Sequence, residues 1–83
     1  MARVIKSNGN EIMVQPKNGT DFKLEELQTV VGGWIEIIGC DGGVMVVNEE
    51  GIVLGLPLNS KASVLAHQTI VGDVLVCETE QIK

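Results

Sequence analysis

The sequence is poor in aromatic residues and in the side chains that bind metals. It has one Trp, one Phe, no Tyr and a single histidine, His67. The two cysteines, Cys40 and Cys77, are far apart and lie in or at the end of apolar runs, so we interpret them as free thiols rather than a disulfide. With no Cys-x-x-Cys pair for His67 to join, we predict no metal site and no cofactor.

Long hydrophobic runs and positive charge are also scarce. No run approaches the roughly 18 apolar residues of a membrane span, and the N-terminus turns polar before a signal peptide could form, so we expect a cytoplasmic protein without membrane contact. Eleven acidic residues against six basic ones give a net charge of −5. This balance opposes binding to long nucleic acids, which needs clustered Lys and Arg. A small anionic ligand, which needs only one or two cations, is compatible with it.

The length of 83 residues predicts a single domain, residues 1–83, with a polar C-terminal tail at 78–83. A chain this short buries only roughly 60 to 65% of the surface that it exposes when unfolded. We therefore expect it to need additional stabilisation, for example from a partner subunit.

Apolar patterning and turn residues predict a mixture of strands and helices. Strands are expected at residues 3–6, 11–15, 33–39, 44–48, 52–56 and 69–78, and helices at 22–33 and 59–68. The strands at 33–39, 44–48 and 52–56 are joined by short turns and predict an antiparallel meander. The predicted fold is α+β, with a small antiparallel sheet of about five to six strands and two short helices.

The two predicted helices differ in their N-terminal caps. The first has Leu24, Leu27 and Val31 on one face, but Lys23 occupies its N-cap position, so we expect Asp21 or Thr20 to cap it. In the second, Asn59 is the expected N-cap, and the residues expected to face inward are Ala62, Leu65 and Ala66.

The predicted strands carry apolar residues on both faces. "VMVV", "IVLGL" and "TIVGDVLVC" do not alternate apolar with polar residues, as a sheet with one wet face would. Two short helices cover about one face of such a sheet. We therefore expect the second face to be buried by homo-oligomerisation, as a dimer or a dimer of dimers, or alternatively by barrel-like curling of the sheet.

Four segments together, "LEELQTVVGGWIEI", "VMVVNEEG", "GLPLN" and "IVGDVLVC", carry a family resemblance. Over about residues 20–80 the chain resembles the small phage and mobile-element proteins described as domain of unknown function 3846. The resemblance implies a phage or prophage context in the host bacterial cytoplasm, where small acidic proteins often act against host defence. The chain departs from the family pattern at Lys23, where a Ser-type cap is usual, and at Ile52, where a basic residue commonly follows the Glu-Glu-Gly turn.

Two polar segments are candidate binding elements. Asn48-Glu49-Glu50-Gly51 fits a plain turn in which Gly51 supplies a positive φ, but Asn48 and Glu49 also offer the donors and acceptors of a small-ligand pocket. Asn59 fits a helix cap, and the same helix start with Lys61 is a candidate phosphate site. A strand at 52–56 would hold the two elements some 20 Å apart, so they could share a ligand only in an oligomer.

Trp34 and Glu36 share one face of a predicted strand. Trp34 is either a core or interface residue or a platform for stacking a base, and Glu36 must be paired or lie in a groove. His67 near a helix end is explained by the helix dipole. We find no nucleophile with a nearby base, no paired-carboxylate motif and no phosphate-loop glycine pattern, so we predict that the protein is not an enzyme.

These residues and the family context lead to one main functional hypothesis. We expect a non-enzymatic phage-type binding protein that sequesters a small anionic ligand, such as a cyclic nucleotide immune signal, at oligomer interfaces, as an anti-defence sponge. The candidate ligand-binding residues are Trp34, Glu36, Asn48, Glu49, Asn59 and Lys61. The alternatives are an acidic protein-interaction module that inhibits a host protein, and a structural or assembly protein with no ligand.

Overall fold

The computed structural model describes residues 2–82, which form one antiparallel sheet with two α-helices and a short 3-10 helix. The strands are β1 (Ala2–Ile5), β2 (Glu11–Val14), β3 (Ile35–Cys40), β4 (Gly43–Asn48) and β5 (Val74–Cys77). The helices are α1 (Leu24–Val31), α2 (Ser60–Ala66) and the 3-10 helix η1 (Thr79–Gln81). The predicted α+β class is confirmed, and the five strands lie within the predicted range.

The last strand of the chain lies in the centre of the sheet. The order is β2-β1-β5-β4-β3, so β5 pairs with both β1 and β4, and β2 and β3 form the two edges. The sheet is open and does not close into a barrel, so the predicted alternative of barrel-like curling is wrong.

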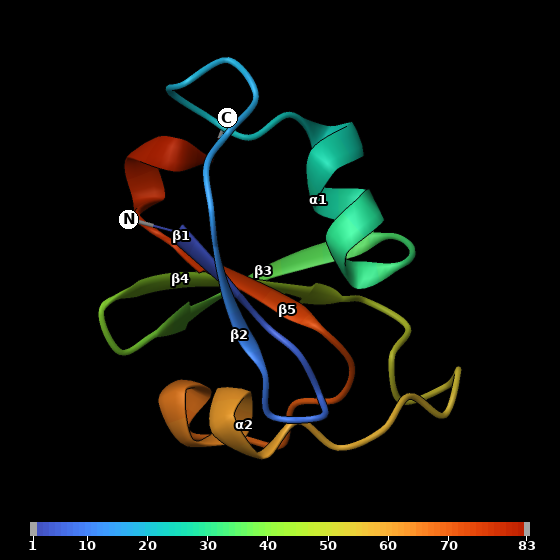
Figure 1. Ribbon diagram of the computed structural model, residues 1–83. Coiled ribbons are helices and arrows are strands. Elements are labelled where there is room, and N and C mark those ends of the chain that lie inside the picture. Colours follow the sequence, from blue (N-terminus) through green and yellow to red (C-terminus); the bar gives the residue numbers. More distant parts are fainter. Residues whose placement is uncertain (1, 83) are drawn as a thin grey trace.

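The two α-helices lie on opposite faces of the sheet (Figure 1). Leu27 and Val31 of α1 belong to one buried cluster with Val46, whereas α2 contributes Ala62 and Ala66 to a second buried cluster. In that second cluster they pack with residues of β4 such as Met45 and Val47. The expectation that two short helices would cover about one face of the sheet is wrong. One chain covers both faces of its own sheet, and this explains why the strands are apolar on both sides.

The predicted third strand of the meander is a loop. Residues 51–55 form consecutive turns, because the backbone donors of this segment are used within it. The N–H of Leu54 donates to the Glu50 carbonyl at 2.9 Å, and the N–H of Leu56 donates to the Gly51 carbonyl at 3.0 Å. The neighbour of β4 on that side is β5, and of the predicted strand 69–78 only Val74–Cys77 is extended in the sheet.

Close packing holds this loop against the chain that follows α2. A Cβ atom on Gly51 would lie 2.8 Å from Val71 Cγ2, so the position needs glycine for space. The expectation that Gly51 supplies a positive φ is wrong, since it is not among the positive-φ glycines. On the other side of the loop, the N–H of Gly72 donates to the Pro57 carbonyl at 2.7 Å, and Leu58 forms a bridge with Val71.

Helix α1 begins differently from the prediction. Lys23 is its N-cap, and the carboxylate that closes the first turn belongs to Glu26, which accepts from the N–H groups of Lys23 and Lys17 at 2.9 Å each. Neither Asp21 nor Thr20 provides the cap. Leu24, expected to face inward, is half exposed because it is the first residue of the helix, ahead of the turn that meets the sheet.

Residues 79–82 of the predicted polar tail pack against the fold. They include η1, and Ile82 forms a parallel bridge with Phe22 and packs against the α1 cluster. This bridge joins the C-terminal segment to the segment that leads into α1.

Candidate functional site

Three of the predicted site residues line one groove beside the β3 edge of the sheet. Glu36, Asn48 and Glu49 border a groove with a volume of about 180 Å³. The strands β3 and β4, the loop after β4 and residues 68–71 after α2 form its walls. Small-ligand pockets usually measure roughly 300 to 1,000 Å³, so this groove has the size for one or two amino acid side chains.

The groove has an apolar floor and an acidic rim. Ile38 and Val47 contribute apolar surface, while Glu36 and Glu49 are exposed, and none of the described residues that line the groove is Lys or Arg. Within residues 2–82, neither side-chain carboxylate has a hydrogen bond or ion pair. The Glu49 N–H donates to the Trp34 carbonyl at 2.9 Å, which holds Glu49 beside the start of β3. The groove is therefore built to attract positive charge rather than phosphate.

Asn48 has its amide group in use within the fold. It is buried, its Nδ2 donates to the carbonyl of Val31 at 3.1 Å, and its Oδ1 accepts from the N–H of Glu50 at 2.8 Å. The first bond joins β4 to the last residue of α1, and the second fixes the start of the loop after β4. Asn48 thus borders the groove, while its oxygen and one of its amide N–H groups bond to the fold.

Asn59 is the predicted N-cap of α2, and the structure shows it deep in the fold. Its side-chain oxygen accepts from the Ala62 N–H at 3.1 Å, while its Nδ2 donates to the carbonyls of Ile5 and Gly72 at 2.9 and 2.8 Å. It is 1% exposed. Asn59 therefore joins β1, α2 and the segment before β5, and it lies outside the groove.

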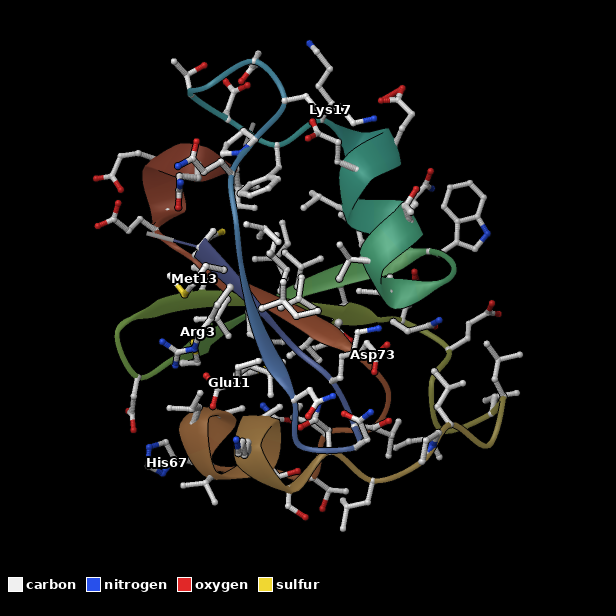
Figure 2. All side chains as sticks on the ribbon, in the orientation of Figure 1. Arg3, Glu11, Met13, Lys17, His67 and Asp73 are labelled. Carbon is white, nitrogen blue, oxygen red and sulfur yellow. The ribbon has the colours of Figure 1, made fainter. Side chains whose placement is uncertain are left out.

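Lys61 is engaged at the opposite edge of the sheet. Its Nζ donates to the Gly9 carbonyl at 2.7 Å and lies 3.1 Å from Glu11 Oε2. The same carboxylate also meets Arg3, with Nε 3.3 Å from Oε1, and Figure 2 shows Arg3 and Glu11 side by side. The cation predicted to hold phosphate therefore bonds within the fold, where it shares the Glu11 carboxylate with Arg3, and it is not brought together with Glu36 and Glu49.

Trp34 lies directly before β3 with 63% of its surface exposed. It does not line the groove. Its exposure rules out a core position within one chain, and its role as an interface residue or a stacking platform stays a prediction.

The loop after β4 exposes a group of apolar side chains that the sequence analysis assigned to a strand. Ile52, Val53 and Leu54 are 75%, 87% and 57% exposed, and Ile52 and Val53 also line the groove. The loop follows β4 and extends from the right of the molecule in Figure 1. Gly51 and Gly55 bracket the three residues in the sequence, but glycines at the ends of a short apolar run do not distinguish a loop from a strand.

Other reactive groups do not assemble into a site. Within residues 2–82 there is no cluster of His, Cys, Asp and Glu able to hold a metal ion. Cys40 and Cys77 are free thiols, and burial raises the pKa of Cys77 to about 11. His67 Nε2 lies 3.0 Å from Asp41 Oδ1 at the surface. The described part of the chain contains no helix with the length and hydrophobicity to cross a membrane.

Comparison with known proteins gives one result. The family described as Domain of unknown function (DUF3846) matches residues 1–82. No curated protein and no solved structure matches the chain.

Proposed function

The chain therefore belongs to the family described as Domain of unknown function (DUF3846), a description that states no activity, and we propose that it is a non-enzymatic, acidic protein-interaction module. The contact surface consists of the exposed loop residues Ile52, Val53 and Leu54 together with the groove rimmed by Glu36 and Glu49. We call this the loop-groove surface.

One observation carries this proposal. The loop holds Ile52, Val53 and Leu54 outward although its backbone is fixed by its own hydrogen bonds, including Gly55 N–H to Ile52 carbonyl at 3.0 Å. Clustered exposed apolar side chains mark protein contact sites more often than single ones do. An ordered loop loses little conformational entropy when it binds, which favours affinity.

The nucleotide-sponge hypothesis remains a prediction with less support. Its phosphate-binding residues, Asn59 and Lys61, are bonded to other groups of the fold, and the groove that contains Glu36 and Glu49 has an acidic rim. The phage context and the host bacterial cytoplasm, which the family resemblance implies, are compatible with either function.

Capture experiments with paired variants test the proposal. Immobilised protein is incubated with bacterial lysate, and the double variant Ile52→Ser with Val53→Ser is compared with the wild type. We expect the wild type to retain a protein in stoichiometric amount and the double variant to retain at least tenfold less. Because the rim is acidic, we also expect retention to fall at high salt.

Val64→Ser is the matched control. Val64 is 72% exposed on α2 and does not line the groove. Its substitution therefore tests whether the removal of any exposed valine side chain reduces retention of the partner protein. We expect this variant to retain the partner like the wild type. Equal retention by the wild type and the double variant would contradict the proposal.

A further inference from the structure

The edge strand β3 presents unpaired backbone groups. In an antiparallel ladder, residues alternate between those whose N–H and C=O face the neighbouring strand and those whose groups face away. The Trp34 carbonyl accepts from the Glu49 N–H, which fixes the phase of this alternation for the β3–β4 pair. The residues whose backbone groups face away from β4 are Ile35, Ile37 and Gly39.

Only the far end of this edge is covered by the described chain. At Asp41, the next residue of the same series, the N–H donates to the Leu65 carbonyl of α2 at 3.0 Å. Before that point β3 is the outermost strand, and Glu36, Ile37 and Gly39 are exposed. A further strand can therefore pair along residues 35–39.

The two edge strands differ in how their charged residue is paired. On β2, Glu11 forms ion pairs with Arg3 and Lys61, and Pro16 follows the strand shortly afterwards. Charged side chains and proline are the usual means of blocking an edge strand. Each edge strand has one charged residue, Glu11 on β2 and Glu36 on β3. Glu11 has two cations beside it and Glu36 has none within residues 2–82, so β3 is the edge that can take a cation from a partner.

The side chains around residues 35–39 indicate which strand fits. Ile38 packs with the cluster that contains α2, and Glu36, two residues earlier, points to the same face of the sheet. Both residues line the groove together with Ile52 and Glu49. A strand added to β3 would therefore place alternate side chains next to the Glu36 carboxylate, which has no ion-pair partner within residues 2–82, and next to Ile38, while Glu49 lies on the β4 side of β3.

We propose that β3 binds an extended segment of a partner protein as an added strand, with a Lys or Arg of that segment next to Glu36 and an apolar side chain, two residues along the segment, next to Ile38. Strand addition of this kind obtains affinity from backbone hydrogen bonds and specificity from alternate side chains. This inference rests on the proposed function and specifies the chemistry of the partner.

Charge favours such a segment over a second copy of this chain. In a two-fold pairing of β3 with itself centred on Ile37, Glu36 of each copy lies opposite Ile38 of the other. A pairing centred on Glu36 sets the two carboxylates against each other, which is destabilising. Since β3 has no Lys or Arg and each chain has a net charge of −5, self-pairing leaves Glu36 without a cation.

Defined peptides test the proposed partner chemistry. The probes are acetyl-Thr-Thr-Lys-Thr-Ile-Thr-Thr-amide and its reversed sequence, which place Lys and Ile on one face of a strand in either direction. Trp34 is the only Trp of the sequence and directly precedes β3, so its fluorescence reports binding. We expect a saturable change with at least one of the two peptides, and at least fivefold weaker binding when Glu replaces Lys in the peptide.

Proline variants at the two edges separate strand addition from other contacts. Ile37→Pro removes an N–H that faces away from β4, a position where an edge strand tolerates proline. We expect this variant to bind the peptide at least tenfold more weakly. Met13→Pro on β2 is the matched control. The Lys6 N–H donates to the Asn10 carbonyl, which fixes the alternation of the β1–β2 pair, and in this alternation the backbone N–H and C=O of Met13 face away from β1. We expect it to bind like the wild type.

Glu36→Gln keeps the shape of the edge and removes its charge. We expect it to bind the Lys peptide about two- to fivefold more weakly, as is usual for an exposed ion pair. Circular dichroism verifies that each variant is folded, and Glu36→Gln tests the inference even if Ile37→Pro does not fold.

The outcomes distinguish this inference from the proposed function. If neither Lys peptide binds while the Ile52→Ser and Val53→Ser variant still loses its captured protein, strand addition is wrong and the interaction module stands. If the wild type forms a dimer that Ile37→Pro abolishes, and the peptides do not bind, the edge pairs with a second copy and the inference is overturned. Peptide binding that Ile37→Pro and Met13→Pro reduce equally overturns it as well.

Discussion

Asn59 connects three segments of the chain through one side chain. Its amide donates to the carbonyls of Ile5 and Gly72 and its oxygen accepts from Ala62, all in a buried position. A buried hydrogen bond contributes roughly 1 kcal/mol, and unpaired buried carbonyls add a cost. We expect Asn59→Ala to lower the free energy of unfolding by about 3 kcal/mol, measured by urea unfolding followed by circular dichroism.

Two further variants make this prediction specific. Asn48→Ala removes two hydrogen bonds and is expected to cost less than Asn59→Ala. Asn59→Asp keeps the oxygen that caps α2 but replaces the donor that faces two carbonyls, so it is expected to be strongly destabilising. An Asn59→Asp protein as stable as the wild type would show that the two amide bonds contribute nothing.

For single residues, the sequence predicted part of the role of Asn59 and of the candidate ligand-binding residues. Asn59 was recognisable as a cap because Asn before an apolar helical pattern is a local signal. Its bonds to Ile5 and Gly72 link positions far apart in the chain, and no local pattern encodes them. Glu36 and Glu49 were predicted separately as candidate ligand-binding residues, and the structure brings them to one groove, whereas it leaves Asn59 and Lys61 elsewhere.

Helix α1 depends on a carboxylate at its start rather than on a conventional cap. The backbone N–H groups of Lys23 and Lys17 donate to Glu26 and lower its pKa below the usual value of 4.5. A lowered pKa means that the unfolded chain binds the proton more readily, so Glu26 stabilises the fold above about pH 4.5. This contribution is lost as the pH falls through the pKa of the folded state.

We therefore expect Glu26→Gln to be less stable than the wild type at pH 7 and to approach it between pH 5 and pH 3. Urea unfolding midpoints across this range provide the measurement. Glu25→Gln is the control, since Glu25 lies in the same first turn and its carboxylate accepts no hydrogen bond within residues 2–82. A constant difference between wild type and Glu26→Gln at every pH would contradict the proposed cap.

Elements with strong periodicity were predicted well, and the apolar segment after β4 was not. Residues 52–56 have the composition of a strand, but the choice between strand and loop depends on whether a neighbouring strand is available. In the fold β5, from the end of the chain, takes the place beside β4. The segment therefore bonds to itself and exposes Ile52 and Val53, which a reading of the adjacent sequence alone does not reveal.

For the whole molecule, the placement of the helices alters the argument for self-association. An oligomer was predicted because both faces of the sheet are apolar and two helices were expected to cover about one of them. Since α1 and α2 cover opposite faces, the apolar strands no longer require a partner subunit. The apolar surface that stays exposed lies partly in the loop-groove surface, at Ile52, Val53 and Leu54.

Native mass spectrometry of the purified protein distinguishes the two main functional hypotheses. An interaction module with both sheet faces covered is expected to be mainly a monomer near 8.9 kDa at about 10 µM, without a bound small molecule. A sponge is expected to be a dimer or a dimer of dimers that carries a nucleotide. If an oligomer appears, spectra of Ile37→Pro and of the Ile52→Ser and Val53→Ser variant show whether β3 or the loop holds it together. An oligomer with a copurified nucleotide would contradict the interaction module, because the ligand-binding residues would then be completed by a second subunit.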